Sequence, residues 1–85
     1  MDYFVYILKS QKDGNYYTGI SANIKNRVKQ HNSGKTKSTR YRRPFKLIYK
    51  EKHNTLEGAR EREKFLKSYS GVAEKKRIID EFDKV

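Results

Sequence analysis

The chain has 85 residues and no cysteine, which indicates one small domain and excludes both disulfide bridges and thiolate metal sites. Charged residues make up 36% of the sequence and apolar residues 34%, a balance that leans toward disorder. Seven Tyr and four Phe offset that balance, because each ring buries a large area, so we expect a thin, aromatic-rich core. The N-terminal sequence lacks a signal-peptide pattern, and no segment approaches the roughly 20 apolar residues of a membrane span. We therefore expect a domain of the reducing cytoplasm that does not enter a membrane.

The formal net charge is +11, and most of it lies in one segment. No acidic residue occurs between Asp13 and Glu51, whereas these 37 residues carry ten Lys or Arg and so supply +10. Such an asymmetry is typical of a protein that binds a polyanion, most often nucleic acid. If the protein performs metal-assisted chemistry, the carboxylate must come from outside this acid-free block, residues 14–50.

The first two elements are predicted to be strands joined as a β-hairpin. Residues 3–8 are β-branched or aromatic, the turn contains Asp13-Gly14, and residues 15–20 form the second strand. Alternation of side chains along a strand gives two faces that are both apolar. One face carries Phe4, Tyr6 and Leu8, and the other carries Tyr3, Val5 and Ile7. Both faces of the sheet should therefore be covered.

The middle of the chain predicts a helix, a basic loop and a third strand. The helix covers residues 21–32, with Ser21 or Asn23 as its N-cap and a stop at residues 32–34. Its core face is thin and consists of Ile24, Val28 and His31. A polar, basic loop follows to Pro44, and residues 45–52 then alternate as a strand. The strand should place Phe45, Leu47 and Tyr49 on one face.

Two helices complete the expected order β-β-α-β-α-α. A capping-box pattern at residues 54–57 begins the first, which should run to about Tyr69 with Phe65 and Tyr69 as a packed flank. Its apolar stripe is Leu56, Ala59, Glu63 and Leu66, so a glutamate occupies a core-facing position. The last helix covers residues 72–85 with Ile78, Ile79, Phe82 and Val85 directed inward. These elements predict a single α+β domain over residues 1–85.

Several residues are candidates for chemistry, each with a plainer structural explanation. Gly19 weakens a strand and often marks close approach by a ligand, whereas Tyr6 and Tyr17 beside it are usual packing residues of a hairpin. Arg27 and His31 share one helix face, where an arginine can hold a phosphate, although both residues are also ordinary for a basic helix.

Glu63 has two interpretations. Either Arg60 or another base pairs with it, or it lines a cleft and holds a cation such as Mg²⁺.

The basic loop combines positive charge with hydroxyls and an aromatic ring, a composition that suits phosphates and stacked bases. We expect it to bind nucleic acid through Lys35, Lys37, Arg40, Tyr41, Arg42 and Arg43.

The order and spacing of these residues resemble the GIY-YIG nuclease domain, in particular its small stand-alone bacterial members. The resemblance rests on Phe4-Val5-Tyr6, on Tyr17-Thr18-Gly19 eleven residues later, and on Arg27, His31 and Glu63 downstream. Residues 17–20, 31–34 and 42–44 also look like that subgroup, and the similarity spans essentially the whole chain. In the first motif, Phe4-Val5-Tyr6, only the tyrosine is the same residue as in the family motif.

The resemblance implies a three-stranded antiparallel sheet flanked by helices, and hydrolysis of a DNA phosphodiester with one divalent cation, Mg²⁺ or Mn²⁺. Glu63 would bind the metal, and Arg27 would stabilise charge on the phosphate. Tyr6, Tyr17 and His31 would position or deprotonate the attacking water, without a choice between the two tyrosines. Several family members carry an asparagine after the glutamate, whereas here no Asn follows Asn54.

We therefore expect a metal-dependent endonuclease in DNA repair that acts on structured or damaged DNA with low sequence specificity. Two alternatives stay open. One is a nucleic-acid-binding module that retains the fold without turnover, and the other is a nuclease subunit that requires a partner protein.

Overall fold

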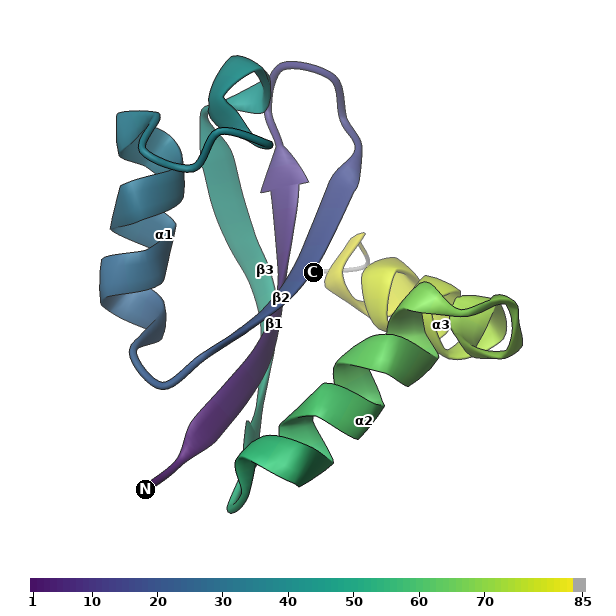
Figure 1. Cartoon of the computed structure of the whole chain (residues 1–85). Helices are drawn as coiled ribbons and strands as arrows, with labels where there is room; N and C mark the ends of the chain where they lie inside the picture. The colour runs from purple at the N-terminus through teal and green to yellow at the C-terminus, as the bar shows by residue number, and fades with distance from the viewer. Residues whose placement is uncertain (84–85) are drawn as a thin grey trace.

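The computed structural model describes residues 1–83 and has the predicted α+β architecture (Figure 1). Its elements are β1 (Tyr3–Ser10), β2 (Tyr16–Ser21), α1 (Ile24–Ser33), η1 (Arg40–Arg42), β3 (Phe45–His53), α2 (Leu56–Lys67), η2 (Tyr69–Gly71) and α3 (Val72–Asp83). The order β-β-α-β-α-α is confirmed, with two short 3-10 helices, η1 and η2, added. The strands form one antiparallel sheet in the order β2-β1-β3. No helix among the described residues is long and apolar enough to cross a membrane.

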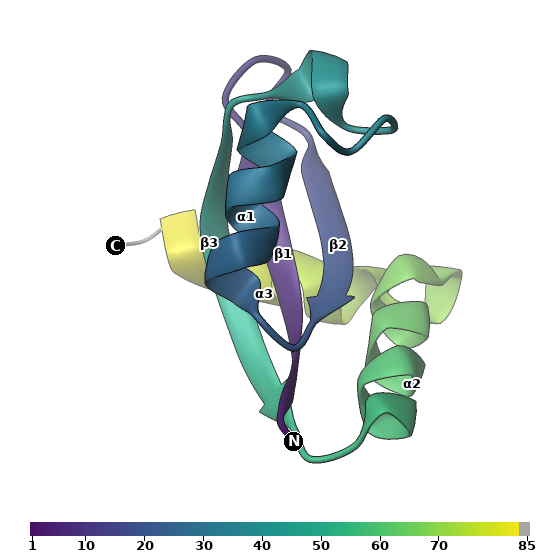
Figure 2. The same ribbon diagram turned by 60° about the vertical axis from the view of Figure 1, so that its left-hand side comes forward.

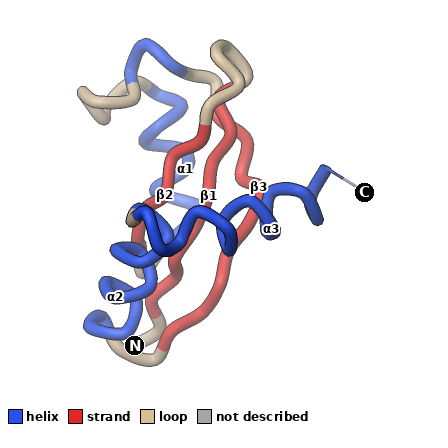
Figure 3. The backbone as a smooth tube through the Cα atoms, turned by 90° about the vertical axis from the view of Figure 1, so that its right-hand side faces the viewer, coloured by secondary structure: helices blue, strands red, loops and turns tan. Residues whose placement is uncertain are grey.

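Both faces of the sheet are covered, as the apolar character of β1 predicts. Helix α1 lies on one face, while α2 and α3 lie on the other (Figures 1 and 2). Tyr6 and Leu8 pack toward α1, and Val5 and Ile7 pack toward α2 and α3. Figure 3 shows that α3 runs across the strands, whereas α2 lies beside the β2 edge in Figure 2. The central strand thus contributes two buried residues to each core.

The predicted face of Tyr49 is wrong because β3 contains a bulge. Ile7 pairs with Tyr49 while the next residue, Leu8, pairs with Leu47, so Ile48 is an extra residue in the ladder. A bulge shifts the alternation of side chains by one position. Phe45 and Leu47 therefore pack on the α1 side, whereas Tyr49 packs with Val5 and Ile7 on the opposite side.

Helix α1 is bounded by side-chain and backbone caps. The Asn23 carboxamide accepts a hydrogen bond from the Asn26 amide at 3.0 Å, which satisfies one free donor of the first turn. The helix begins three residues later than predicted, because Ser21 still belongs to β2. Gly34 ends the helix in the left-handed region at φ +82°, where glycine is the favoured residue.

Helix α2 differs from the prediction at both ends. Thr55 is its N-cap, and the Thr55 hydroxyl accepts from the Gly58 amide at 3.0 Å, so the box at residues 54–57 does not form the cap. The helix ends at Lys67, because the Ser68 amide turns back to the Phe65 carbonyl. The expected packed flank is consequently wrong: Phe65 is 39% exposed and Tyr69 is 96% exposed.

Helix α3 buries Ile78 and half-buries Ile79 and Phe82, as predicted. The predicted inward position of Val85 lies outside the described residues.

Candidate active site

The five residues predicted to be catalytic come from four elements. Tyr6 lies on β1, Tyr17 on β2, Arg27 and His31 on α1, and Glu63 on α2. The first four gather on the α1 side of the sheet, where Tyr6 and Tyr17 share a cluster with the apolar residues of α1. The hairpin and one helix face therefore form the centre of the site, and α2 contributes the carboxylate from beside the β2 edge (Figure 2).

His31 is completely buried and uses both ring nitrogens. Its Nε2 lies 3.1 Å from the Tyr6 hydroxyl, and its Nδ1 lies 2.9 Å from the Thr39 hydroxyl. The Thr39 hydroxyl also donates to the Thr36 carbonyl in a long hydrogen bond of 3.4 Å, which leaves its oxygen free to accept from His31 Nδ1. In that tautomer the ring carries its proton on Nδ1, and Nε2 accepts a hydrogen bond from Tyr6. We call Tyr6, His31 and Thr39 the proton relay.

Burial and charge keep the proton relay neutral. Burial lowers the pKa of His31 below its ordinary 6.5, and the nearby Arg27 charge lowers it further, so the ring is neutral at pH 7. Burial also raises the pKa of the Tyr6 hydroxyl, although the Arg27 guanidinium acts in the opposite direction. Tyr6 therefore holds its proton at neutral pH, 3.1 Å from a neutral imidazole nitrogen.

Tyr17 and Arg27 complete the wall around the proton relay. The Tyr17 ring packs edge-on against His31 with the ring centroids 4.8 Å apart, and it is half-buried where Tyr6 is buried. Arg27 is half-buried and donates from Nη1 to the Gln30 side chain at 3.0 Å. Its interaction with Tyr6 raises the pKa of the guanidinium, so Arg27 is a fixed positive charge beside the relay.

Another group lies very close to the Gly19 backbone, as the sequence suggested. That group belongs to the protein itself and not to a ligand. A Cβ atom on Gly19 would lie 2.6 Å from the Tyr6 hydroxyl and 3.0 Å from the Tyr17 ring. Only glycine at this position of β2 leaves room for the Tyr6 hydroxyl beside the strand.

Glu63 pairs with a base, and that base is Lys67 rather than Arg60. The Lys67 ammonium lies 3.1 Å from the Glu63 carboxylate and 5.8 Å from the centroid of the Tyr17 ring. The Glu63 charge is close enough to the relay to raise the pKa of Tyr6. The Glu63 side chain is 26% exposed, so the carboxylate remains open to a ligand.

The residues present fit a cation whose ligands come partly from the substrate. They do not fit a cation that is bound by protein side chains alone. Within residues 1–83, no three His, Cys, Asp or Glu side chains gather as a metal-binding group. Mg²⁺ at phosphoryl sites commonly takes one or two carboxylates and completes its shell with water and phosphate oxygens. Glu63 can supply one such carboxylate.

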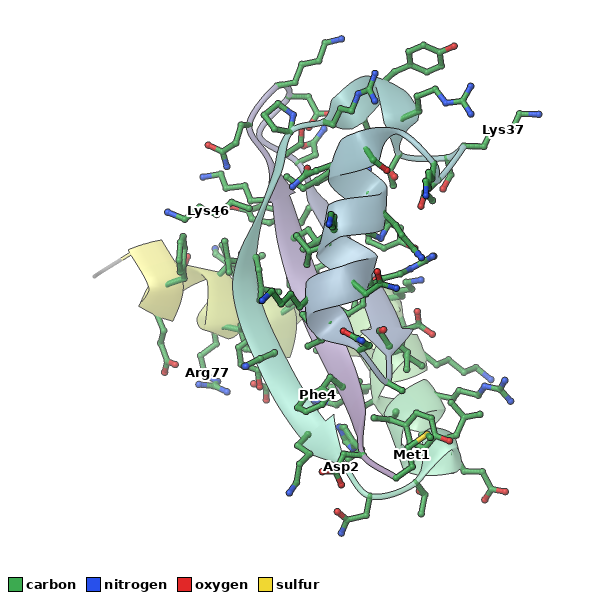
Figure 4. The ribbon with its side chains drawn as sticks, turned by 90° about the vertical axis from the view of Figure 1, so that its left-hand side faces the viewer. Met1, Asp2, Phe4, Lys37, Lys46 and Arg77 are labelled. Atoms are coloured by element: carbon green, nitrogen blue, oxygen red, sulfur yellow. The ribbon has the colours of Figure 1, made fainter. Side chains whose placement is uncertain are left out.

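The basic loop has an outer and an inner side. Lys35, Lys37 and Tyr41 are exposed, Tyr41 to 76%, and the Lys37 side chain projects away from the domain in Figure 4. On the inner side, Thr39 is buried against His31.

The loop arginines are held by the chain itself. Arg42 donates from Nε to Asp13 at 2.9 Å, which ties the loop to the hairpin turn, and Arg40 donates to the Gly34 carbonyl at 3.0 Å. The Arg43 guanidinium packs where a side chain on Gly34 would lie.

Two contributors to the site were missed from the sequence. Thr39 orients His31, but it lies in a loop with no periodicity, and no sequence signal separates it from its neighbours. Asn32 joins the end of α1 to β3, because its side chain accepts from the Phe45 amide at 2.6 Å and donates to the Phe45 carbonyl at 3.1 Å. Phe45 in turn packs edge-on against His31, with the ring centroids 5.9 Å apart.

Comparisons with known proteins identify a family and several relatives of this chain. The family model described as the GIY-YIG catalytic domain matches residues 2–77. A UPF0213 protein of Staphylococcus epidermidis is 44% identical over 69 residues, covering 80% of this chain and 83% of the relative. A UPF0213 protein of Staphylococcus aureus is 41% identical over 80 residues, covering 93% of this chain and 95% of the relative. The solution NMR structure of a UPF0213 protein from Bacillus halodurans is similar at TM-score 0.56 and 35% identity, covering 94% of this chain and 84% of the other.

The depressed pKa of His31 predicts that folding stability falls with acidification. Because the folded state binds this proton less readily than the unfolded state, the stabilisation is complete above pH 6.5 and is lost as the pH falls toward the lower folded pKa. Urea unfolding between pH 7.5 and 5 should show this loss, and NMR titration should place the pKa of His31 below 6.5. The His53→Gln variant should retain this pH dependence of the unfolding free energy, and the His31→Gln variant should lose it. A His31 ring that titrates at or above 6.5 would contradict the assignment.

The close approach at Gly19 predicts an energetic coupling with Tyr6. Gly19→Ala should cost about 1–3 kcal/mol of unfolding free energy, because the new methyl group displaces the Tyr6 ring. In a Tyr6→Phe background the cost should be reduced only in part, since the hydroxyl oxygen is gone but the ring carbon Cζ stays 2.8 Å from the new methyl group. Urea denaturation of the two single variants and the double variant measures the coupling. An equal Gly19→Ala cost in both backgrounds would show that the hydroxyl is not the obstacle.

Proposed function

Because the chain belongs to the GIY-YIG catalytic domain family, we propose that it is a divalent-metal-dependent endonuclease that hydrolyses phosphodiester bonds of DNA. The observation that carries the proposal is the proton relay. A buried tyrosine hydroxyl points its proton at a neutral imidazole, beside a fixed guanidinium. Such an arrangement suits removal of a proton from an attacking water next to an anion.

Each group then has a defined part in the reaction. Tyr6 takes a proton from the attacking water as its own proton passes to His31 Nε2, while Thr39 holds the ring through Nδ1. The water oxygen forms the new bond to phosphorus, the bond from phosphorus to the sugar oxygen breaks, and that oxygen takes a proton from solvent. Arg27 balances negative charge on the phosphate, and the half-buried Tyr17 positions the water and the substrate.

Glu63 is the residue that would hold Mg²⁺ or Mn²⁺ at this site. A divalent ion there supplies positive charge that stabilises the leaving oxygen. The ion pair with Lys67 must open for the carboxylate to serve this role.

The class of substrate is inferred from the net charge and the size of the domain. The net charge of +11 and the exposed side of the basic loop favour nucleic acid, and the family favours DNA. A domain of 85 residues offers little surface for base-specific contacts, so recognition should depend on DNA structure rather than on sequence.

A second candidate is a nucleic-acid-binding module without turnover, and the Glu63–Lys67 pair favours it. An ammonium 3.1 Å from the carboxylate already neutralises the group that the metal would need.

Glu63→Gln separates the two candidates. For a nuclease, cleavage with Mg²⁺ or Mn²⁺ should fall by about 100-fold or more, because a charge that stabilises the transition state is removed, while DNA affinity is retained. Cleavage of duplex, flap, branched and single-stranded DNA gives the rate, and fluorescence anisotropy gives the affinity. Glu61→Gln, an exposed neighbour on α2, is the matched control. A wild-type protein that binds these DNAs and cuts none of them would establish the binding module.

The proton relay predicts a pH–rate profile. His31 must be neutral to accept a proton, and its pKa lies below 6.5, so the cleavage rate should hold at pH 7 and fall as the pH drops through that lowered pKa. Tyr6→Phe should reduce the rate by about 10²–10⁴-fold, because the relay is broken. Tyr3→Phe, on the opposite face of the sheet, should leave rate and profile unchanged. A Tyr6→Phe variant that retains the wild-type rate would remove Tyr6 from proton transfer.

A further inference from the structure

A pocket of about 500 Å³ lies between the start of β2, the end of α2 and the first half of α3. Its walls include the apolar surfaces of Tyr16, Leu66 and Ile79, and its polar lining includes Lys67, Lys75 and Lys76. An apolar wall beside several ammonium groups suits a ligand with a flat apolar body and negative charge next to it.

Two of the three lysines of the pocket, Lys75 and Lys76, carry charge that no ion pair within residues 1–83 balances. Both Lys67 and Lys75 line the pocket; burial lowers the pKa of the Lys75 ammonium, and the positive charge of Lys67 lowers it further. Of the described residues that line the pocket, none is acidic. Among residues 1–83, Lys67 forms an ion pair with Glu63, whereas Lys75 and Lys76 form none. An anion at this position would relieve the repulsion between Lys67 and Lys75.

The pocket adjoins the candidate active site around the β2 edge of the sheet. Tyr16 and Tyr17 are consecutive on β2 and point to opposite faces, Tyr17 toward the proton relay and Tyr16 into the pocket. Lys67 belongs to both places, because its ammonium contacts the Tyr17 ring and Glu63 while its side chain lines the pocket. Lys67 is therefore shared by the candidate active site and the pocket.

We propose, resting on the function proposed above, that this pocket holds an unpaired base of the nucleic-acid strand that is bound at the active site. Lys75 and Lys76 hold the phosphates that flank the base, while Tyr16, Leu66 and Ile79 contact its faces. A base inside a duplex has both faces stacked on its neighbours, so only a base that has left the stack can present its faces to these side chains. The substrate class is therefore DNA with unpaired nucleotides beside the scissile bond, such as a flap, a branch or a single strand.

The roles of the two lysines can be measured in EDTA, without cleavage, by fluorescence anisotropy of oligo(dT) and of a blunt duplex across a salt series. For Lys75→Gln/Lys76→Gln, the log–log salt slope on oligo(dT) should flatten by about 1.4, because each phosphate that is no longer neutralised lowers the slope by about 0.7. The slope on the duplex should change little. The control, Lys52→Gln/Lys64→Gln, removes the same charge from exposed lysines that do not line the pocket and should leave the slope on oligo(dT) unchanged. Equal slopes for the two double variants, or equal losses of affinity on both DNAs, would overturn the proposal.

The binding of the base has its own test. An abasic oligonucleotide of the same length keeps every phosphate and lacks the bases, so the wild-type protein should bind it several-fold more weakly than oligo(dT). Equal affinity for the two would exclude a base from the pocket.

These results are separable from those on cleavage. Binding effects as expected with no cleavage of any DNA would reject the nuclease and keep the pocket, whereas cleavage without these effects would reject the pocket alone.

Discussion

The docking of helix α1 on the sheet depends on the burial of one histidine side chain. His31 is the only residue of α1 that is fully buried, so the helix docks on the sheet through an imidazole. A buried ring must satisfy both nitrogens, because an unpaired polar atom in the interior costs about 1–3 kcal/mol. The Tyr6 hydroxyl on the central strand and the Thr39 hydroxyl in the loop meet that requirement. The groups that hold the helix in place are therefore the groups that would move a proton.

The same requirement explains the glycine and the aromatic residues around the ring. Tyr6 reaches His31 only because Gly19 leaves the space beside β2 empty. Tyr17 and Phe45 pack edge-on against the imidazole and shield it from water. Shielding keeps the ring neutral, and a neutral ring is the form that accepts the Tyr6 hydrogen bond. The packing around His31 thus also determines its protonation state.

Much of this arrangement could be predicted from the sequence. Alternation in β1 predicts a sheet that is covered on both faces, and the spacing of Arg27 and His31 predicts one helix face. The position of Tyr49 could not be predicted, because a bulge opposite Ile7 and Leu8 is a property of strand pairing and not of β3 alone. Thr39 could not be found either, since nothing local marks the hydroxyl that a distant imidazole selects. Lys67 could have been inferred as the partner of Glu63 from their spacing of four along a helix.

The basic loop faces two environments within a few residues. Its outer side presents Lys37 and the 76% exposed Tyr41 to solvent, and its inner side places Thr39 against the buried imidazole. Thr39 is two residues from Lys37 and two from Tyr41, so one short stretch of backbone carries both the exposed side chains and the hydroxyl that holds His31. A substitution that changes the course of this loop would therefore also move the Thr39 hydroxyl relative to the imidazole. The outer surface of the loop and its inner hydrogen bond cannot vary independently as the sequence diverges.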